Sequence, residues 1–402
     1  MRVAIIGGGA GGFFSAIQVK ENHPSAEVTI YEKSKRFLSK VKISGGGRCN
    51  VTNSETSIKL LSEAYPRGGK KLKNAFTKFS TQDMQTWLTE RGVPLVTQSD
   101  ACVFPESQES QSIIDCFMAE VVRLGINVQL SRGIQKLQSL GEEIVLHFGE
   151  DDVEVFDKVI VATGGSPKLS GLKWLADLGH KIEEPVPSLF TFNMPDEKST
   201  ELMGIVVNET KVAIQGTKLK SDGPLLLTHW GMSGPAILKL SAFGARILKD
   251  LDYEFKIQVN WVNELNNEIV ANVVREIIEE HPAKQLSSIK PYGVPERLWI
   301  YLLEKSDLAA TKKWPELGKK GLNKLVNVLT NDIYQVKGKT TFKEEFVTCG
   351  GVSLESIDFN SMQSKVVPNL YFTGEVMDID GITGGYNFQA CWTTAFIAGK
   401  LA

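Results

Sequence analysis

The sequence lacks paired cysteines and long apolar runs, and each absence narrows the class of protein. Five cysteines are scattered over 402 residues with no CxxC pair, which fits a reducing cytoplasm and a chain that needs no disulfides. No apolar run approaches the ~18 residues of a membrane span. The opening stretch "MRVAIIGGGAGG" also lacks the apolar core and cleavage site of a signal peptide. We therefore expect a cytoplasmic protein with no membrane partner.

A surplus of positive charge is also missing. The chain has 45 basic and 47 acidic residues, a formal net charge of −2, and this balance disfavours a nucleic-acid partner. One segment differs, because "YPRGGKKLKNAFTKF" (65–79) places basic residues beside aromatics in a pattern typical of RNA-binding patches. A solvated helix face is the simpler interpretation of that segment. Its basic residues are Arg67, Lys70, Lys71, Lys73 and Lys78.

The N-terminus carries a dinucleotide-binding arrangement. An apolar run from Val3 to Ile6 predicts a buried parallel strand, and glycines in G-x-G-x-x-G spacing and an apolar helix follow it. The next strand, "EVTIYEK", ends in Glu32, whose carboxylate can bind ribose hydroxyls. An acid at this position favours FAD or NAD over NADP. The residues expected to contact the dinucleotide are Gly7, Gly9, Ala10, Gly11, Gly12 and Glu32.

Two later segments favour FAD over NAD. The strand in "DKVIVATGGSP" (157–167) ends in small residues, and "PNLYFTGEVMDIDGITGGYNFQACWTTAFIAGKLA" (368–402) reads as a strand, a glycine-rich turn and a final helix. A chain that returns to its first nucleotide fold at the C-terminus is typical of flavoproteins of the glutathione-reductase type, in which a helix N-terminus can stabilise negative charge on the reduced ring. Short strands expected at Ile134–Leu137, Ile144–Phe148 and Val153–Phe156 form the antiparallel crossover. The expected contacts are Ile134, Ala162, Thr163, Gly164, Gly165, Gly374, Glu375, Asp378, Gly385, Tyr386, Asn387 and Phe388.

The motifs together resemble the YhiN/BaiN-like flavoproteins, a bacterial family that includes enzymes called aminoacetone oxidases. The resemblance rests on "SGGGRCNVTN" after "GGGAGG", on the C-terminal "TGEVMDIDGITGGYNFQACWTTAFIAG", and on "GMSGPAIL" and "TCGGVSL". It implies an α/β fold, with a discontinuous FAD-binding Rossmann-like domain, an inserted β-barrel-like domain and a small helical domain. It also implies either reduction of conjugated enones in bile-acid-like steroids or oxidation of small amino-ketones.

The middle of the chain fits this division. Residues 187–262 alternate β-branched or aromatic residues with polar ones, which indicates antiparallel β structure. Between 263 and 330 the pattern becomes helical, and Leu265, Ile269, Val273 and Ile277 predict one apolar helix face. We expect the FAD domain at 1–186 and 345–402, the β domain at 187–262 and 331–344, and the helical insert at 263–330.

The segment "KISGGGRCNVTN" (42–53) predicts a cofactor clamp. Six cations occur between 33 and 48 with no acid among them. A solvated basic loop is one interpretation, but the adjacent glycines favour neutralisation of the FAD pyrophosphate, with the glycines lying against the flavin and its ribityl chain. The expected contacts are Lys33, Lys40, Ser44, Gly45, Gly46, Gly47, Arg48, Cys49 and Asn50.

The catalytic group is not fixed by the sequence. Cys49 has Ser44 and Ser54 where a dithiol partner would lie, so we expect it to pack beside the flavin, with thiolate chemistry as the alternative. His229 and Tyr386 are further candidates, for which structural or binding roles are simpler. Only one G-x-G-x-x-G is present, so NADH or NADPH is expected to visit the flavin transiently if it is the reductant. We expect no metal site.

These patterns predict an FAD-dependent oxidoreductase that transfers a hydride between flavin and a small organic substrate. Enone reduction and amine or amino-ketone oxidation both stay open, and so do reductase and oxidase activity. A non-catalytic FAD-containing scaffold that binds a macromolecule is the alternative. The sequence does not indicate the oligomeric state.

Overall fold

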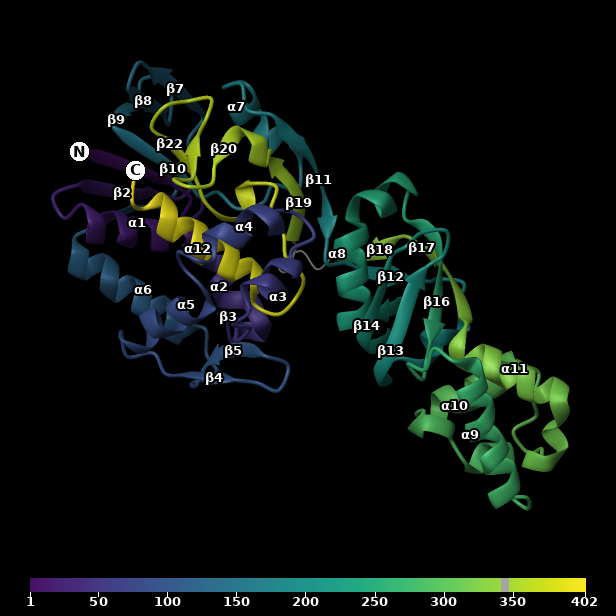
Figure 1. The fold of residues 1–402 in the computed structure, drawn as a ribbon. Helices are drawn as coiled ribbons and strands as arrows, with labels where there is room; N and C mark the ends of the chain where they lie inside the picture. The colour runs from purple at the N-terminus through teal and green to yellow at the C-terminus, as the bar shows by residue number, and fades with distance from the viewer. Residues whose placement is uncertain (341–346) are drawn as a thin grey trace. The chain divides into compact units, whose positions relative to one another are not determined.

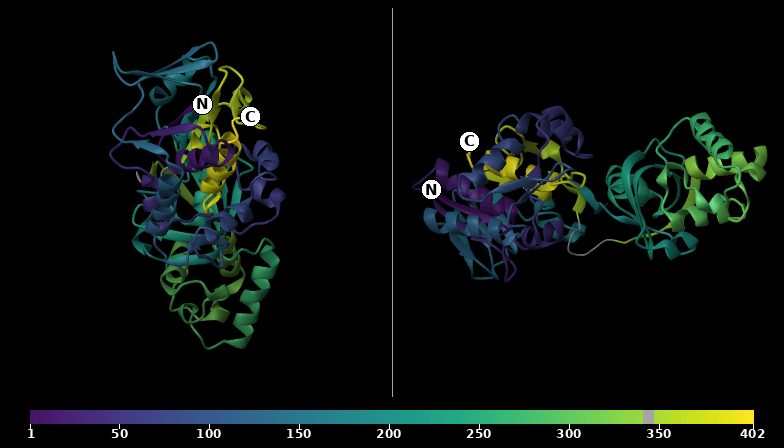
Figure 2. Two further views of the ribbon diagram at one scale, coloured as in Figure 1. Left: turned by 90° about the vertical axis from the view of Figure 1, so that its left-hand side faces the viewer. Right: turned by 90° about the horizontal axis from the view of Figure 1, so that it is seen from below.

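The computed structural model describes residues 1–340 and 347–402, which form two compact units. The first unit contains Met1–Ser188 and Lys343–Ala402, and the second contains Leu189–Phe342. Both chain ends lie in the first unit (Figures 1 and 2). The domain boundary expected between 344 and 345 lies outside the described residues. Within the described ranges, no helix combines the length and hydropathy that a membrane span requires.

The first unit is built on a sheet with the strand order β20-β21-β22-β10-β1-β2-β6, in which β22, β10, β1, β2 and β6 run parallel. Central strands of this sheet are nearly continuous apolar runs, as expected for parallel strands covered on both faces. The strands are β1 (Arg2–Ile6), β2 (Glu27–Tyr31), β6 (Asn127–Gln129), β10 (Lys158–Val161), β20 (Ile357–Asp358), β21 (Gln363–Ser364) and β22 (Leu370–Phe372).

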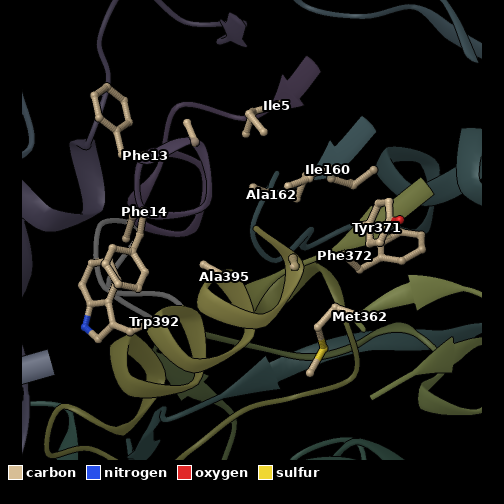
Figure 3. Packing of buried hydrophobic residues seen from close by; sticks show 14 of the residues in the cluster. Ile5, Phe13, Phe14, Ile160, Ala162, Met362, Tyr371, Phe372, Trp392 and Ala395 are labelled. Atoms are coloured by element: carbon tan, nitrogen blue, oxygen red, sulfur yellow. The ribbon is translucent and has the colours of Figure 1, made fainter. Parts of the chain in front are cut away.

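Helices from both ends of the chain cover this sheet. Helix α1 (Ala10–Asn22) packs along α12 (Tyr386–Ala398), although more than 360 residues separate their starts. Phe14 and Trp392 meet edge to face, with ring centroids 5.7 Å apart (Figure 3). Phe117 of α6 (Gln111–Leu124) stacks on the same tryptophan at 5.6 Å. The predicted return of the C-terminus to the first nucleotide fold is therefore confirmed.

Two helices of the first unit have local start or stop signals at their ends. Helix α5 (Thr81–Thr89) begins with a capping box between Ser80 and Asp83. Helix α6 ends at Gly125, which adopts the left-handed conformation. Cys116 in α6 is buried, as expected for a small core residue.

Smaller sheets and helices complete the first unit. The antiparallel crossover is confirmed, although its first strand begins two residues later than predicted. These elements are α2 (Ser39–Ile43), β3 (Thr52–Asn53), α3 (Ile58–Glu63), α4 (Gly69–Ala75), β4 (Leu95–Thr97), β5 (Cys102–Pro105), β7 (Lys136–Leu140), β8 (Glu143–His147), β9 (Val153–Phe156), α7 (Lys173–Ala176), β11 (Ile182–Ser188) and β19 (Val347–Val352).

The second unit contains a sheet in which one continuous chain segment forms both edge strands. Its order is β17-β16-β13-β14-β15-β12-β18, and β17 continues into β18 through Gly338. Because this segment pairs with β16 at one edge and with β12 at the other, the sheet is barrel-like. The strands are β12 (Thr191–Asn193), β13 (Val206–Ile214), β14 (Lys220–Thr228), β15 (Gly231–Ser233), β16 (Glu254–Asn260), β17 (Asp332–Lys337) and β18 (Lys339–Thr340).

Helices of the second unit differ from the prediction in two ways. A 16-residue helix, α8 (Pro235–Asp250), interrupts the segment expected to be β structure. Helix α9 (Asn267–Glu280) is confirmed, but it buries Val270 and Val274, whereas Leu265 and Ile269 are exposed. The helical segment also includes α10 (Glu296–Lys305) and α11 (Gly318–Thr330) and shares one hydrophobic core with the strands.

Candidate functional site

The candidate site lies where the parallel strands of the first unit end. Gly7 follows β1 and donates its N–H to Tyr31 O at 2.8 Å, which ties the glycine turn to the end of β2. Ala162 follows β10 and donates to Ile6 O at 2.8 Å, and Thr373 follows β22 and donates to Val161 O at 3.0 Å. These bonds bring the ends of four strands to one edge, here called the carboxyl edge. In open α/β sheets, ligands bind at this edge.

Glu32 lies beside the glycine turn, as the dinucleotide motif predicts. Its carboxylate accepts the Gly8 N–H at 2.8 Å and the Ser34 N–H at 2.8 Å. The segment that includes Ile134 runs alongside, because Arg132 donates its N–H to Glu32 O at 2.9 Å. Gly133 lies against the Lys33 side chain. The expected ribose-binding acid, Lys33 and Ile134 are therefore close together.

Motif glycines in the first turn serve two different purposes. A methyl group on Gly12 would lie 1.9 Å from Gly7 O, and one on Gly7 would lie 2.4 Å from Ala162 O. These two glycines therefore permit close packing of helix on strand. A methyl group on Gly9 would meet no atom of the described residues within 4 Å. Gly9 is also the N-cap of α1, with no side-chain cap and no acid in the first turn.

This arrangement fits an FAD pyrophosphate. An uncapped helix N-terminus offers backbone N–H groups and a positive dipole end to an anion, and Gly9 leaves room for close approach. Gly46, Gly47 and Gly164 likewise face open space among the described residues. These three glycines have φ values of +69°, +85° and +71°, which glycine adopts without strain.

The segment 44–50 is held in place by its own backbone and by β5. Gly45 has a φ of +57° and packs against the Phe104 ring. Arg48 lies over the same ring, 4.2 Å from its centroid, and donates to Gly45 O at 3.1 Å. The Asn50 carboxamide joins this segment to the start of α12, because its oxygen accepts the Gly385 N–H at 3.1 Å.

Cys49 is fully buried and its pKa is raised to about 12, chiefly because burial disfavours the thiolate. The Ser44 hydroxyl is hydrogen-bonded to the thiol and offsets part of this effect. A thiol in this state is protonated at neutral pH. The geometry therefore favours packing over thiolate chemistry at Cys49.

Lys40 connects the cationic segment to the C-terminal motif. Its ammonium lies 2.9 Å from Glu375 Oε2, and this carboxylate raises the pKa of Lys40. Glu375 Oε1 accepts the Thr348 N–H at 2.8 Å. A methyl group on Gly165 would lie 2.5 Å from the Glu375 carboxylate. A methyl group on Gly374 would lie 2.5 Å from the Cys391 sulfur.

The loop that precedes α12 is fixed by a buried ion pair. The Arg67 guanidinium binds both carboxylate oxygens of Asp380, whose side chain is fully buried. Ser188 also donates to Asp380, at 2.6 Å. Burial raises the pKa of Asp380, and the hydrogen bond and charge of Arg67 oppose this rise.

Residues at the start of α12 bind mainly to their own loop. Both amide atoms of Asn387 bond to the Gly381 backbone, at 2.8 and 3.0 Å. Phe388 stacks on Trp392 with centroids 5.6 Å apart. Tyr386 accepts the Tyr65 hydroxyl on its backbone oxygen at 2.6 Å, and burial raises the pKa of the Tyr386 phenol.

Two other predicted site residues differ in their position. One is buried and joined to β19 through its backbone, and the other belongs to the second unit. Asp378 is buried and donates its N–H to Val352 O at 2.9 Å. His229 belongs to the second unit, where it is exposed and packs on Trp230 at 4.3 Å. Among the described residues there is no cluster of His, Cys, Asp or Glu that could hold a metal ion.

Two residues at this site, Thr348 and Cys391, were not singled out in the sequence analysis. Thr348 is 1% exposed, and its hydroxyl has no hydrogen-bond partner among the described residues. The Cys391 thiol accepts the N–H groups of Gly11 and Glu375, and burial raises its pKa to about 12. Arg67 had been noticed only for its charge. Thr348 and Cys391 lie within the motifs quoted above, but no periodicity or spacing there distinguishes them from their neighbours.

Known proteins match the whole chain. The family model HI0933-like protein Rossmann domain matches residues 1–401. The 3-dehydro-bile acid delta(4,6)-reductase of Clostridium scindens is 24% identical over 410 residues, covering 100% of this chain and 98% of that protein. The ribosomal RNA dihydrouridine synthase of Haemophilus influenzae is 27% identical over 404 residues, covering 98% and 96%.

A solved structure shares the fold. The 3-ketosteroid delta1-dehydrogenase of Sterolibacterium denitrificans aligns with a TM-score of 0.50 at 11% identity, covering 99% of this chain and 98% of that one. The family match, the Rossmann-type sheet and the glycine turn agree with one another. The chain belongs to the HI0933-like family, which places it among the FAD-dependent oxidoreductases.

Proposed function

We propose that this protein is an FAD-dependent reductase that adds hydrogen across a carbon–carbon double bond conjugated with a carbonyl group. The proposal rests on one observation: the names of two relatives imply substrates that share such a double bond. A delta(4,6)-reductase of a 3-dehydro bile acid and a dihydrouridine synthase both act on such a bond. In uridine it is the C5–C6 bond of the uracil ring.

Bound FAD would supply the hydride, and the chain's own residues would hold the cofactor at the carboxyl edge. The turn at Gly9 and the N-terminus of α1 would bind the pyrophosphate, and Glu32 the adenosine ribose. Lys40 and Glu375 form a polar pair that would bind the ribityl chain. Gly46 and Gly47 leave room beside the ring, and the start of α12 would stabilise its negative charge.

The proton that completes the reduction needs a different group. The Cys49 thiol is a poor donor, because its pKa is raised to about 12 and it is fully buried. The Tyr386 phenol is half-buried at the start of α12, so unlike the Cys49 thiol it is accessible to a substrate, and it carries its proton at neutral pH. We propose Tyr386 as the donor to the carbon next to the carbonyl group.

Uridine in RNA is the proposed substrate, and this revises the expectation that nucleic acid is not a partner. The exposed lysines of α4 support it, since they lie in the same unit as the carboxyl edge. A small steroid-like enone is the second candidate, supported by the bile acid reductase at similar identity. Amine oxidation has no comparable support. The electrons would come from NADH or NADPH that binds transiently.

One anaerobic experiment tests the proposal. The holoprotein is reduced with NADH, NADPH or light and then mixed with ribosomal RNA, with a 3-oxo steroid that has conjugated double bonds, or with oxygen. We expect RNA to reoxidise the flavin and to gain two hydrogen atoms per modified uridine, as measured by mass spectrometry of the nucleosides. Reoxidation by oxygen alone, with no hydrogen gained by either substrate, would contradict a reductase.

A further inference from the structure

The surface of α4 gathers positive charge that the site described above does not use. No acid occurs between residues 64 and 79. The helix buries Gly69, Leu72 and Ala75, three residues apart on one face. Lys70, Lys71 and Lys73 are exposed, and Lys78 follows just beyond the helix. The sequence spacing therefore anchors the helix by its apolar face and turns its lysines to solvent.

These lysines differ from three arginines of the first unit, whose charge is already neutralised by carboxylates. Arg91, Arg123 and Arg132 each pair with carboxylates, at 2.6 to 2.8 Å in their closest contacts. By contrast, no carboxylate of residues 1–340 or 347–402 lies within 4.0 Å of the four α4-region ammonium groups. Within the described part of the chain, Lys78 donates only to the Asn360 carbonyl, at 3.0 Å. Their charge is therefore available to a partner.

The lysine surface is joined rigidly to the start of α12. Helix α4 packs beside α12 (Figure 1). Just before α4, Tyr65 and Arg67 bond to Tyr386 O and to Asp380. Ile382 donates its N–H to Ala64 O at 2.9 Å. A polyanion held by α4 would therefore lie next to the loop that we assign to the flavin end of the site.

We infer that Lys70, Lys71, Lys73 and Lys78 form the docking surface for the phosphate backbone of an RNA substrate. This inference rests on the proposed reduction of uridine. Backbone contacts carry no sequence information but fix the position of the nucleic acid. Reduction of a ring inside folded RNA also requires the base to leave its stack, so the neighbouring backbone must be held while the base turns inward.

The test compares two triple variants of the holoprotein. In the first, Lys70, Lys71 and Lys73 are replaced by glutamate. In the matched control, the same change is made at Lys218, Lys319 and Lys320, which are exposed and belong to the second unit. Binding to a ribosomal RNA fragment and to vesicles of anionic phospholipid is measured at several salt concentrations, with FAD content and thermal stability recorded for each variant.

We expect the α4 variant to bind the RNA at least about tenfold more weakly at moderate salt and to lose about two units of salt-dependence slope, since each phosphate contact contributes about 0.7 to 0.9. The control should stay within about twofold, and FAD content and thermal stability should be unchanged in both. Equal loss in both variants, no loss in either, or binding to vesicles in place of RNA would overturn the inference. RNA binding is measured without catalysis. It therefore tests the docking surface even if the protein forms no dihydrouridine.

Discussion

The turn between β1 and α1 and the turn at residues 45–47 both contain packed glycines and glycines that face open space. Packed glycines predominate in the first turn, and open ones in the second. In the first, Gly7 and Gly12 are packed against backbone atoms and Gly9 faces open space. In the second, Gly45 packs on Phe104, whereas Gly46 and Gly47 face open space. Packed glycines allow the chain to fold, and open glycines leave room for a ligand. The difference separates residues that hold the fold from residues that serve the cofactor.

The largest expected effect comes from a packed glycine. In Gly12→Ala the new methyl group would overlap Gly7 O, so the helix must move away from the strand. We expect the free energy of unfolding to fall by about 4 kcal/mol or more, measured by urea denaturation. Gly9→Ala is the matched control and should change stability by less than about 1 kcal/mol, because φ is −90° and the space is open. Equal losses in the two variants would contradict the distinction.

The same contrast applies to charged side chains. Arg67→Met leaves the Asp380 carboxylate buried without its partner, and we expect a loss of about 3–5 kcal/mol. Lys173→Met breaks an exposed pair with Asp177 and should cost no more than about 1 kcal/mol. Thermal and urea unfolding measure both. A small effect at Arg67 would show that the pair does not fix the loop before α12.

Much of the first unit could be predicted from the sequence, because its signals are local. Strand, glycines, helix and acid follow within 32 residues, and the caps of α5 and α6 lie within their own segments. The second unit was harder to predict. Helix α8 begins at a Gly-Pro step within a stretch of β pattern, and the buried face of α9 is one residue away from the expected one, so that Val270 replaces Ile269.

The site's long-range contacts could not be predicted at all. Lys40 and Glu375 are 335 residues apart, and Arg67 and Asp380 are 313 apart. Their spacing carries no periodic signal, and only the fold brings them together. The sequence favours Lys40 or Arg48 as the cation at the FAD pyrophosphate, and this stays a prediction; the structure adds that Lys40 pairs with the Glu375 carboxylate. The assignment of the remaining glycines and of Cys49 to FAD stays a prediction.

A smaller effect is expected at Cys49. Cys49→Ser removes a buried thiol and should change FAD content and flavin reoxidation by only a few-fold, as spectrophotometry can show. Loss of an acid role would cost about 10²-fold or more. Because folding raises the pKa of this thiol from 9.0 to about 12, its contribution to stability is present below pH 9 and is lost as the pH rises toward 12. Wild type and Cys49→Ser should therefore have parallel stability curves below pH 9 and diverge only above it.

The most direct test of the account is the FAD content of Gly9→Val. Because Gly9 has an extended backbone and faces open space, the variant should fold with a free energy of unfolding close to that of wild type. Its side chain would occupy the place that we assign to the FAD pyrophosphate. We expect wild-type protein to release about one FAD per chain on heating and the folded variant to be colourless. A folded Gly9→Val protein with stoichiometric FAD would contradict the assignment of the carboxyl edge as the cofactor site.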